Sequence, residues 1–266
     1  MEIPLFQVDA FTSKPFGGNP AAICPLSEWL PEVVMQAIAA ENNLSETAFL
    51  VEDDGDDADY ALRWFTPAIE VDLCGHATLA AGHVVFEHLR PDTEAVRFST
   101  RSGVLEVARE AGGALRMDLP ADPRSPTSAP DGLAEILGST PTEVLGGSTW
   151  VAVLDDAEAV RSLRPDPDAI GRLDPPYLNV TAAGDADSGV DFVSRFFAPG
   201  AGIDEDPVTG SAHCALTPYW AKRLGTDRLV ARQVSRRGGE LDCELLADRV
   251  VVRGRCVQVL QGTLSF

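Results

Sequence analysis

Alternating apolar and polar residues recur in short runs along most of the chain. In residues 59–65, the apolar side chains of Tyr60, Leu62 and Trp64 occupy every second position, which is typical of a half-buried strand. Similar patterns predict strands at residues 5–11, 47–51, 104–107, 115–119, 150–154, 192–197 and 250–260. The glycine pairs at 112–113 and 238–239 predict turns that join neighbouring strands into hairpins.

Three segments instead carry apolar residues at helical spacing, and they predict helices at 30–41, 75–89 and 210–224. Pro31 suits the first turn of the first helix. The other two helices are rich in small residues near their beginnings, which allows close packing in a core. Many hairpins with few helices, and no regular strand-helix-strand alternation, predict an α+β fold rather than a doubly wound parallel sheet.

A polar, proline-rich stretch at residues 121–130 predicts a domain boundary. We therefore expect two domains, 1–120 and 121–266, and allow that the final strand crosses back to the first half. Both halves contain a strand that ends in aromatic-x-Pro, at 65–67 and 197–199, followed by an acidic loop and a Gly-polar-Ala sequence. Either these short matches are coincidental or the chain contains an internal duplication.

A duplication would give two helices that begin alike, at Gly75-His76 and at Gly210-Ser211. We expect both helix N-termini to face a shared cleft, where unpaired backbone N–H groups and the positive ends of the helix dipoles attract an anion. Backbone groups bind carboxylates without lysine side chains, and this chain has only Lys14 and Lys222. The pattern thus favours a small carboxylated ligand.

Composition narrows the classes of function. The chain has 266 residues, 45% of them hydrophobic, with 41 acidic and 21 basic residues and a formal net charge of -20. Such a charge repels nucleic acids and anionic membrane surfaces, so neither is expected as a partner. No long apolar run or signal-like N-terminus is present, which predicts a cytoplasmic protein. Five scattered cysteines without a CxxC motif favour reduced thiols over disulfides.

Three residues stand out as candidates for chemistry. Glu46 follows a polar helix exit and begins a hydrophobic strand, where partial desolvation suits a carboxylate to general acid/base work. The alternative interpretation is that Glu46 is an ordinary loop carboxylate or caps a helix. Asp206 precedes Pro207 and either caps the following helix or accepts hydrogen bonds from a substrate amine or hydroxyl. His76 either donates to a bound carboxylate or is a structural histidine.

A metal site is a weaker interpretation. Cys74 with His76, and His213 with Cys214, would have to combine across the two halves, and the spacing within each pair is unlike common zinc ligation. We therefore predict neither a metal nor a cofactor. His83 and His88 are interpreted as surface or packing residues of the helix at 75–89.

Four motifs in this order cover nearly the whole chain. They are Asp-Ala-Phe-Thr at 9–12 with Phe-Gly-Gly-Asn-Pro at 16–20, Leu-Ser-Glu-Thr-Ala-Phe at 44–49, Cys-Gly-His-Ala-Thr-Leu-Ala at 74–80, and Glu-Asp-Pro-Val-Thr-Gly-Ser-Ala at 205–212. Together they resemble the PhzF-like phenazine-biosynthesis family, which has a diaminopimelate epimerase-like fold. The resemblance implies two similar halves, each a curled, mostly antiparallel sheet around a central helix, with the active site between them, and a homodimer.

The resemblance also implies roles for individual residues. In the phenazine enzyme of this family, a glutamate moves a proton during isomerisation of trans-2,3-dihydro-3-hydroxyanthranilate without cofactor or metal, and the matching residue here is Glu46. The family's substrate-binding motifs map onto Gly75 and His76 in the first half. In the second half they map onto Asp206, Gly210 and Ser211.

Two departures keep alternatives open. Related epimerases carry a pair of catalytic cysteines where this chain has Cys74 and Thr209, so a thiol-based two-base mechanism lacks one of its bases. The sequence around Cys74 and His213 also differs from the phenazine enzyme itself, and the substrate is therefore not transferred. We predict a cofactor-independent isomerase, with a Cys74/Glu46 epimerase or racemase and a non-catalytic small-molecule-binding protein as alternatives.

Overall fold

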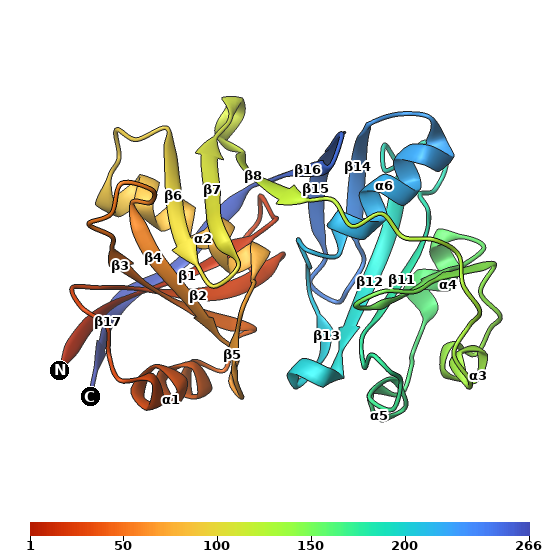
Figure 1. The fold of residues 1–266 in the computed structure, drawn as a ribbon, viewed down its shortest axis with the longest axis horizontal. Coiled ribbons are helices and arrows are strands. Elements are labelled where there is room, and N and C mark those ends of the chain that lie inside the picture. The colour runs from red at the N-terminus through yellow and green to blue at the C-terminus, as the bar shows by residue number, and fades with distance from the viewer. The chain divides into compact units, whose positions relative to one another are not determined.

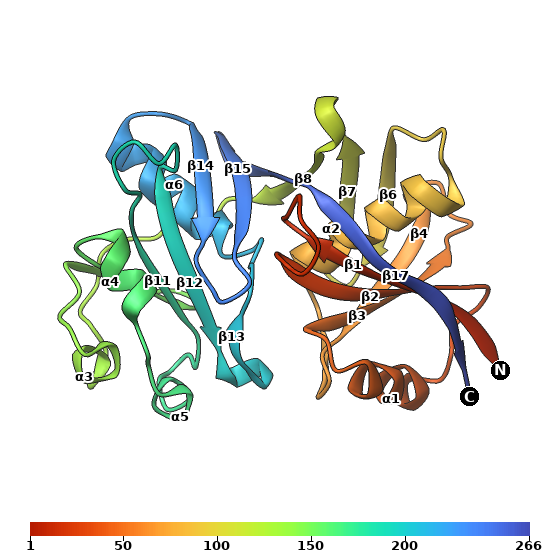
Figure 2. The same cartoon turned by 180° about the vertical axis from the view of Figure 1, so that it is seen from behind.

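The computed structural model describes residues 1–266 and divides into two compact units (Figure 1). Unit 1 contains residues 1–119 and 251–266, and unit 2 contains residues 120–250. The last strand, β17 (Cys256–Ser265), pairs antiparallel with the first, β1 (Glu2–Ala10), and Figure 2 shows them side by side. Residues 251–266, which the sequence division counted with the second half, are therefore part of unit 1 because their hydrogen bonds are made there.

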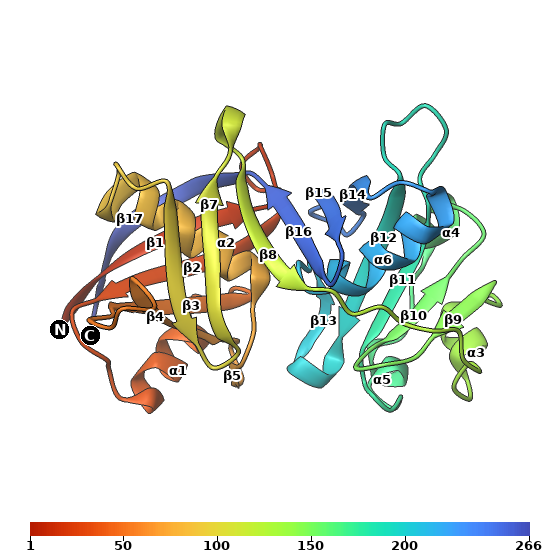
Figure 3. The same cartoon turned by 45° about the horizontal axis from the view of Figure 1, so that its top comes forward.

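Unit 1 is a curled sheet around a helix. Its strands run in the order β17-β1-β2-β3-β4-β6-β7-β8, with β5 beside β4, and all neighbours are antiparallel except the pairs β2–β3 and β4–β6. The bounds are β2 (Asn19–Leu26), β3 (Glu46–Glu52), β4 (Tyr60–Phe65), β5 (Glu70–Val71), β6 (Ala95–Thr100), β7 (Gly103–Arg109) and β8 (Leu115–Pro120). Helix α2 (Gly75–Val84) lies inside the curl (Figure 3) and packs on β1, β2, β3, β7 and β17.

Helix α1 (Glu32–Asn42) packs on β3 and β4. Its buried Met35 and Ile38 join Phe49 and Phe65 in one apolar cluster. Because side chains alternate along β3, the neighbours of Phe49 point to the opposite face, toward α2. The sheet of unit 1 is thus covered by a helix on each face, which explains why β3 is apolar on both sides.

Unit 2 repeats this plan. Its strands run in the order β9-β10-β11-β12-β14-β15, with β13 beside β12, and only the pairs β10–β11 and β12–β14 are parallel. The bounds are β9 (Glu143–Leu145), β10 (Trp150–Val153), β11 (Leu178–Ala183), β12 (Phe192–Ala198), β13 (Ile203–Asp206), β14 (Arg228–Gln233) and β15 (Gly239–Leu246). Helix α6 (His213–Leu224) packs on β14 and β15, and the short α4 (Ala157–Ser162) packs on β11 and β12.

The order of parallel and antiparallel pairs is the same from β2 to β7 as from β10 to β15. Each unit also has a short strand between the strand that carries the aromatic-x-Pro sequence and the central helix. This short strand is β5, of two residues, in unit 1 and β13, of four residues, in unit 2. Two units with one topology confirm the internal duplication and the α+β class. The remaining short helices, α3 (Leu133–Leu137) and α5 (Pro167–Ile170), belong to unit 2.

Most predicted elements are present, with three corrections. The helix predicted from Gly210 begins at His213, and residues 210–212 form tight turns whose carbonyls accept from N–H groups three residues later. The segment 85–89 continues α2 as a π-helical turn. The strand predicted at 250–260 is two strands, β16 (Arg249–Gly254) and β17, which are separated by the single residue Arg255.

Helix α6 contains Pro218, which lacks an N–H group and cannot bond to the carbonyl of Cys214 four residues earlier. That carbonyl accepts instead from the backbone N–H of Asp122, at 2.9 Å. The proline-rich segment after β8 is thus held against the central helix of unit 2. None of the helices combines the length and the apolar character that crossing a membrane requires.

The two central helices meet different surfaces. In unit 2, the fully buried side chains of Asn179, Ser194, His213 and Thr217 hold polar atoms that have no partner within the protein. Strand register places Asn179 and Ser194 on the face of the sheet opposite the apolar Val180 and Val193. The residues of unit 1 at the same positions of the repeat are Ala48, Leu62, Thr78 and Gly82. The helix-sheet contact of unit 2 therefore contains buried polar groups at four positions that are mostly apolar in unit 1.

Candidate active site

Glu46 is placed by the end of α1. Asn43 caps that helix in the left-handed conformation, with φ 49° and ψ 38°, and its N–H bonds to the carbonyl of Ala39 at 3.1 Å. The chain then turns, and Glu46 becomes the first residue of β3, opposite Ala21 of β2. Its side chain is buried, as expected for a carboxylate at the junction of a helix exit and a core strand.

His76 lies in the first turn of α2, and its Nε2 is 3.1 Å from Oε2 of Glu46. Both side chains are buried. The two atoms are close enough for a hydrogen bond, but the ring is not aimed directly at the oxygen. Catalytic hydrogen bonds are often poorly aligned without substrate. Sequence reasoning placed His76 at a helix start, and the structure brings it to Glu46.

The other ring nitrogen of His76 has two neighbours. Nδ2 of Asn19 lies 3.0 Å from Nδ1, and Sγ of Cys74 lies 3.5 Å from it. Asn19 is the first residue of β2 and is fully buried. Sequence reasoning gave Asn19 no role, although it belongs to the Phe-Gly-Gly-Asn-Pro motif, because nothing in the sequence shows that this motif meets the helix at 75.

Burial dominates the electrostatics of this cluster. It raises the pKa of the Cys74 thiol to about 11, with a further contribution from the Glu46 carboxylate, so Cys74 is protonated at neutral pH. Burial alone would lower the pKa of His76, but its interactions with Cys74 and Glu46 raise that pKa well above the ordinary range. Since Cys74 is a thiol at neutral pH, Glu46 is the neighbour that favours a protonated ring there.

The possible ligand atoms of Glu46, Cys74 and His76 lie within 4.8 Å of one another, which is close enough for a metal site to be considered. The imidazole, however, faces Cys74 with Nδ1 and Glu46 with Nε2. The two contacts thus use different ring nitrogens, and a single ion can bind only one of them. The arrangement suits proton transfer along a ring better than tetrahedral ligation.

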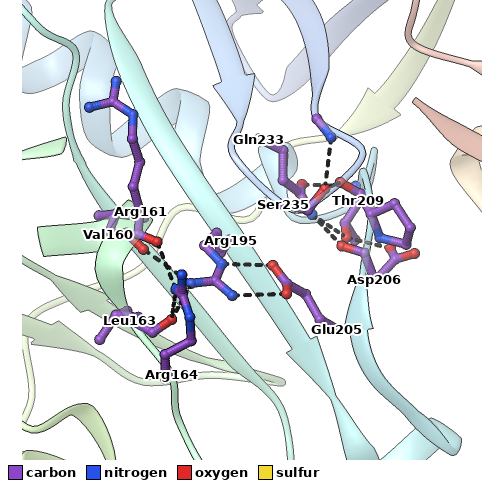
Figure 4. Close-up of polar contacts among 12 residues, drawn as sticks. Val160, Arg161, Leu163, Arg164, Arg195, Glu205, Asp206, Thr209, Gln233 and Ser235 are labelled. Atoms are coloured by element: carbon purple, nitrogen blue, oxygen red, sulfur yellow. Dashed lines mark hydrogen bonds and ion pairs between the residues drawn. The ribbon is translucent and has the colours of Figure 1, made fainter. Parts of the chain in front are cut away.

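Unit 2 builds a second polar cluster, around Asp206 (Figure 4). Asp206 ends β13, and its Oδ2 accepts a hydrogen bond from the hydroxyl of Thr209. Gln233 of β14 is fully buried and clamps this loop at two points: its Nε2 donates to the carbonyl of Asp206 at 2.7 Å, and its Oε1 accepts from the N–H of Thr209 at 2.9 Å. Sequence reasoning missed Gln233, which lies 24 residues after Thr209.

The structure therefore groups the predicted site residues by unit. Glu46, Gly75 and His76 are together in unit 1, with Cys74 and Asn19 added. Gly210 and Ser211 follow the Asp206–Thr209 loop of unit 2 directly, in the turns before α6.

The histidines outside the cluster behave as packing residues. The ring of His88 stacks on Phe6 with 4.6 Å between the centroids, and its Nε2 lies 2.6 Å from Oε1 of Gln258. His83 lies on α2, and burial lowers its pKa. His88 is exposed and His83 is partly buried, which agrees with their interpretation as surface or packing residues.

Comparison with known proteins gives a consistent result. The family model described as phenazine biosynthesis-like protein matches residues 8–262. An uncharacterized isomerase of Pseudomonas aeruginosa is 51% identical over 264 residues and covers 99% of both chains. The human phenazine biosynthesis-like domain-containing protein is 38% identical over 288 residues, with 100% of both chains covered.

Solved structures agree in fold. The crystal structure of a phenazine biosynthesis protein of the PhzF family from Enterococcus faecalis matches 100% of both chains, with a TM-score of 0.94 and 44% identity. A hydroxyproline epimerase from Agrobacterium vitis matches 99% of this chain and 92% of its own, with a TM-score of 0.62. At 13% identity, this second likeness concerns the fold alone.

Proposed function

The chain belongs to the phenazine biosynthesis-like family, whose relatives include isomerases, and from this premise we propose that it moves a proton on a small carboxylated substrate through Glu46. One observation carries the proposal. Glu46 is a buried carboxylate 3.1 Å from the imidazole of His76, at the start of the central helix. A carboxylate in such a place can take up a proton, and a neighbouring ring can orient it.

The proposed reaction uses one group twice. The Glu46 carboxylate removes a proton from a carbon of the substrate, and the C–H electron pair becomes part of a shifted double bond. The protonated Glu46 then returns the proton to another carbon of the same molecule. Because the acid/base group is regenerated, no cofactor is needed. Glu46 is buried but keeps 8% of its surface exposed, so part of the proton that it holds exchanges with solvent before its return.

We propose that the substrate carboxylate binds the N–H groups of the first turn of α2, at Gly75 and His76. No side chain caps this turn, so its N–H groups have no competitor among the capping side chains. Gly210 and Ser211 of unit 2 are proposed to share in binding that carboxylate, and Asp206 to fix an amine or hydroxyl of the substrate. The family resemblance further supports a homodimer.

The alternative epimerase would use Cys74 and Glu46 as bases on opposite faces of one carbon. Each base must approach that carbon to about 3 Å, so the two have to stand about 6 Å apart. Their donor atoms lie within 4.8 Å of one another, which leaves too little room between them. Burial also raises the pKa of Cys74 to about 11, so at neutral pH the thiol is protonated and cannot accept a proton. These observations favour the single carboxylate.

Deuterium uptake from solvent tests the proposal. Wild-type protein is incubated in D2O with trans-2,3-dihydro-3-hydroxyanthranilate and then with other small carboxylated metabolites, and incorporation is measured by mass spectrometry. Glu46→Gln should lower incorporation by about 10²- to 10⁴-fold. Glu52→Gln is the matched control, because Glu52 ends the same strand, is exposed and pairs with Arg90.

The outcomes separate the three interpretations. Incorporation that survives Glu46→Gln sinks the assignment of Glu46. A comparable loss in Cys74→Ser, together with inversion of a stereocentre, supports the epimerase. Binding of a metabolite with neither deuterium uptake nor conversion to an isomer by the wild type supports the non-catalytic binding protein.

A further inference from the structure

We propose that Asn19 is a positioning residue: its carboxamide keeps Nδ1 of His76 unprotonated, so that a neutral ring presents its only proton on Nε2 toward Glu46. The contact behind this inference is direct. Nδ2 of Asn19 lies 3.0 Å from Nδ1 of His76, and both side chains are buried. The catalytic meaning rests on the proposed function, whereas the protonation of the ring does not.

Strand register explains why Asn19 reaches the ring. Asn19 lies two residues before Ala21 on β2, and Ala21 is opposite Glu46 on β3. Residues two apart on a strand point to the same face, so Asn19 projects to the side of the sheet on which α2 lies. The following residue, Pro20, pairs with Asp9 of β1, which fixes the strand from its first residues onward.

The chemistry of the carboxamide determines where the proton lies. An amide NH2 group only donates, and a ring nitrogen accepts a hydrogen bond only while it keeps its lone pair. If Asn19 donates to Nδ1, the one proton of the neutral imidazole must be on Nε2. That nitrogen lies 3.1 Å from Oε2 of Glu46, and a small rotation of the ring would let it donate to the carboxylate. The Cys74 thiol, 3.5 Å from Nδ1, is a weaker donor to the same lone pair.

Asn19 and Glu46 act on the ring in opposite senses. The Glu46 carboxylate favours a second proton on His76. With that proton, an Nδ1–H donor would face the NH2 donor of Asn19 at 3.0 Å, which is unfavourable unless the carboxamide rotates by half a turn and offers its oxygen. The difference matters because a permanent imidazolium beside Glu46 favours the carboxylate over the acid. A general base that must also return its proton works better next to a neutral ring.

Ring-nitrogen NMR tests the inference without a substrate. Protein labelled with ¹⁵N is followed by long-range ¹H–¹⁵N correlation from about pH 5 to pH 9, and the His76 signals are assigned as those lost in His76→Gln. In the wild type, at the alkaline end, we expect a protonated Nε2 and a bare Nδ1. Asn19→Asp replaces the donor by an accepting carboxylate and should raise the titration midpoint of His76 by about 1–3 pH units.

Two further variants complete the design. Asn19→Leu removes the donor without adding charge and should raise the midpoint by less than Asn19→Asp does. Asn42→Asp is the matched control, because it adds the same charge to a partly buried asparagine whose Nδ2 bonds to Oγ1 of Thr47 at 3.0 Å rather than to the ring. It should shift the midpoint least of the three.

Two results would overturn the inference. One is a wild-type ring that is neutral with its proton on Nδ1, or doubly protonated up to about pH 9. The other is an unchanged midpoint in both Asn19 variants. If Asn19→Asp does not fold, the wild-type spectrum and Asn19→Leu still decide. A failed Glu46→Gln experiment would remove the proposed isomerase function but leave these ring states unaffected.

Discussion

Arg63 and Arg195 occupy equivalent positions on β4 and β12, and each holds a glutamate by two parallel hydrogen bonds. Arg63 donates from Nε and Nη2 to Glu70, both at 2.7 Å, and Arg195 donates in the same way to Glu205, at 2.7 and 2.9 Å. The glutamates lie on the inserted strands β5 and β13, just before the central helices. The duplicated ion pair anchors the segment that leads to His76 in one unit and to Asp206 in the other.

Arg195 should be the more sensitive of the two arginines to substitution. Its Nη1 also donates to the carbonyl of Leu163 at 2.8 Å, and its side chain is 9% exposed (Figure 4). Arg195→Met leaves Glu205 without its donor, whereas the Leu163 carbonyl keeps a hydrogen bond from Nη1 of Arg164 at 2.6 Å. We expect the free energy of unfolding, measured with urea, to fall by about 3 kcal/mol.

Arg228→Met is the matched control for this substitution. Arg228 also pairs with a glutamate on the neighbouring strand, Glu244 at 3.0 Å, but its side chain is 77% exposed. Water screens such a pair, so we expect a loss below about 1 kcal/mol. Equal losses in the two variants would show that burial does not set the strength of the Arg195 pair.

His213 should make stability depend on pH. Burial lowers its pKa to about 4, whereas in the unfolded chain it titrates near the ordinary value of about 6.5. Between these values the unfolded state binds a proton that the folded state does not, so stability falls as the pH is lowered. The loss should reach about 3 kcal/mol at about pH 4.

Urea unfolding of His213→Gln from pH 7 to pH 4 measures this effect. The variant should show a flatter dependence on pH than the wild type, because it lacks the buried group. The control is His88→Gln, since His88 is stacked on Phe6 outside the core of unit 2. An identical slope in the wild type and in His213→Gln would contradict the prediction.

Ordered water should occupy the polar contact beneath α6. Each unpaired polar atom of Asn179, Ser194, His213 and Thr217 would cost about 1–3 kcal/mol if it stayed without a partner. The combined cost is comparable to the stability of a whole domain, so we expect water molecules bonded to these atoms in a high-resolution crystal structure. The four equivalent positions in unit 1, Ala48, Leu62, Thr78 and Gly82, hold no such unpaired atoms and are the internal control. Side chains bonded only to one another would refute the prediction.

Gln233 should hold the Asp206 loop in place. Its Oε1 accepts from the backbone N–H of Thr209, so Gln233→Met removes the acceptor and leaves the volume nearly unchanged. Amide hydrogen exchange of Thr209 should become faster by about 10-fold, which corresponds to the loss of one hydrogen bond of about 1 kcal/mol. The amide of Leu229, in the ladder between β14 and β15, should keep its rate. Unchanged exchange at Thr209 would show that the loop is held by other contacts.

Local patterns predicted elements where a single face is buried. The alternation at 59–65 identified β4, and helical spacing with Pro31 identified α1. The prediction missed β2 and β11, whose residues are buried on both faces and do not alternate. It also missed β6, β14 and β15, although burial alternates along these three strands. The helix start at Gly210 was placed three residues early, because the small residues that permit a helix also permit the tight turns found there.

The sequence by itself determined the α+β class, the repeat, the strand-start position of Glu46 and the two Gly-polar-Ala segments, because each of these depends on residues close together in the chain. Only the tertiary structure decided that Asn19 and Glu46 meet opposite nitrogens of His76, and that Gln233 meets the Asp206 loop. These contacts join residues that are distant in the chain, and they depend on strand order and register, which no local pattern specifies. The histidine at 76, visible in the sequence as a helix start, thus acquires the two neighbours that decide its protonation.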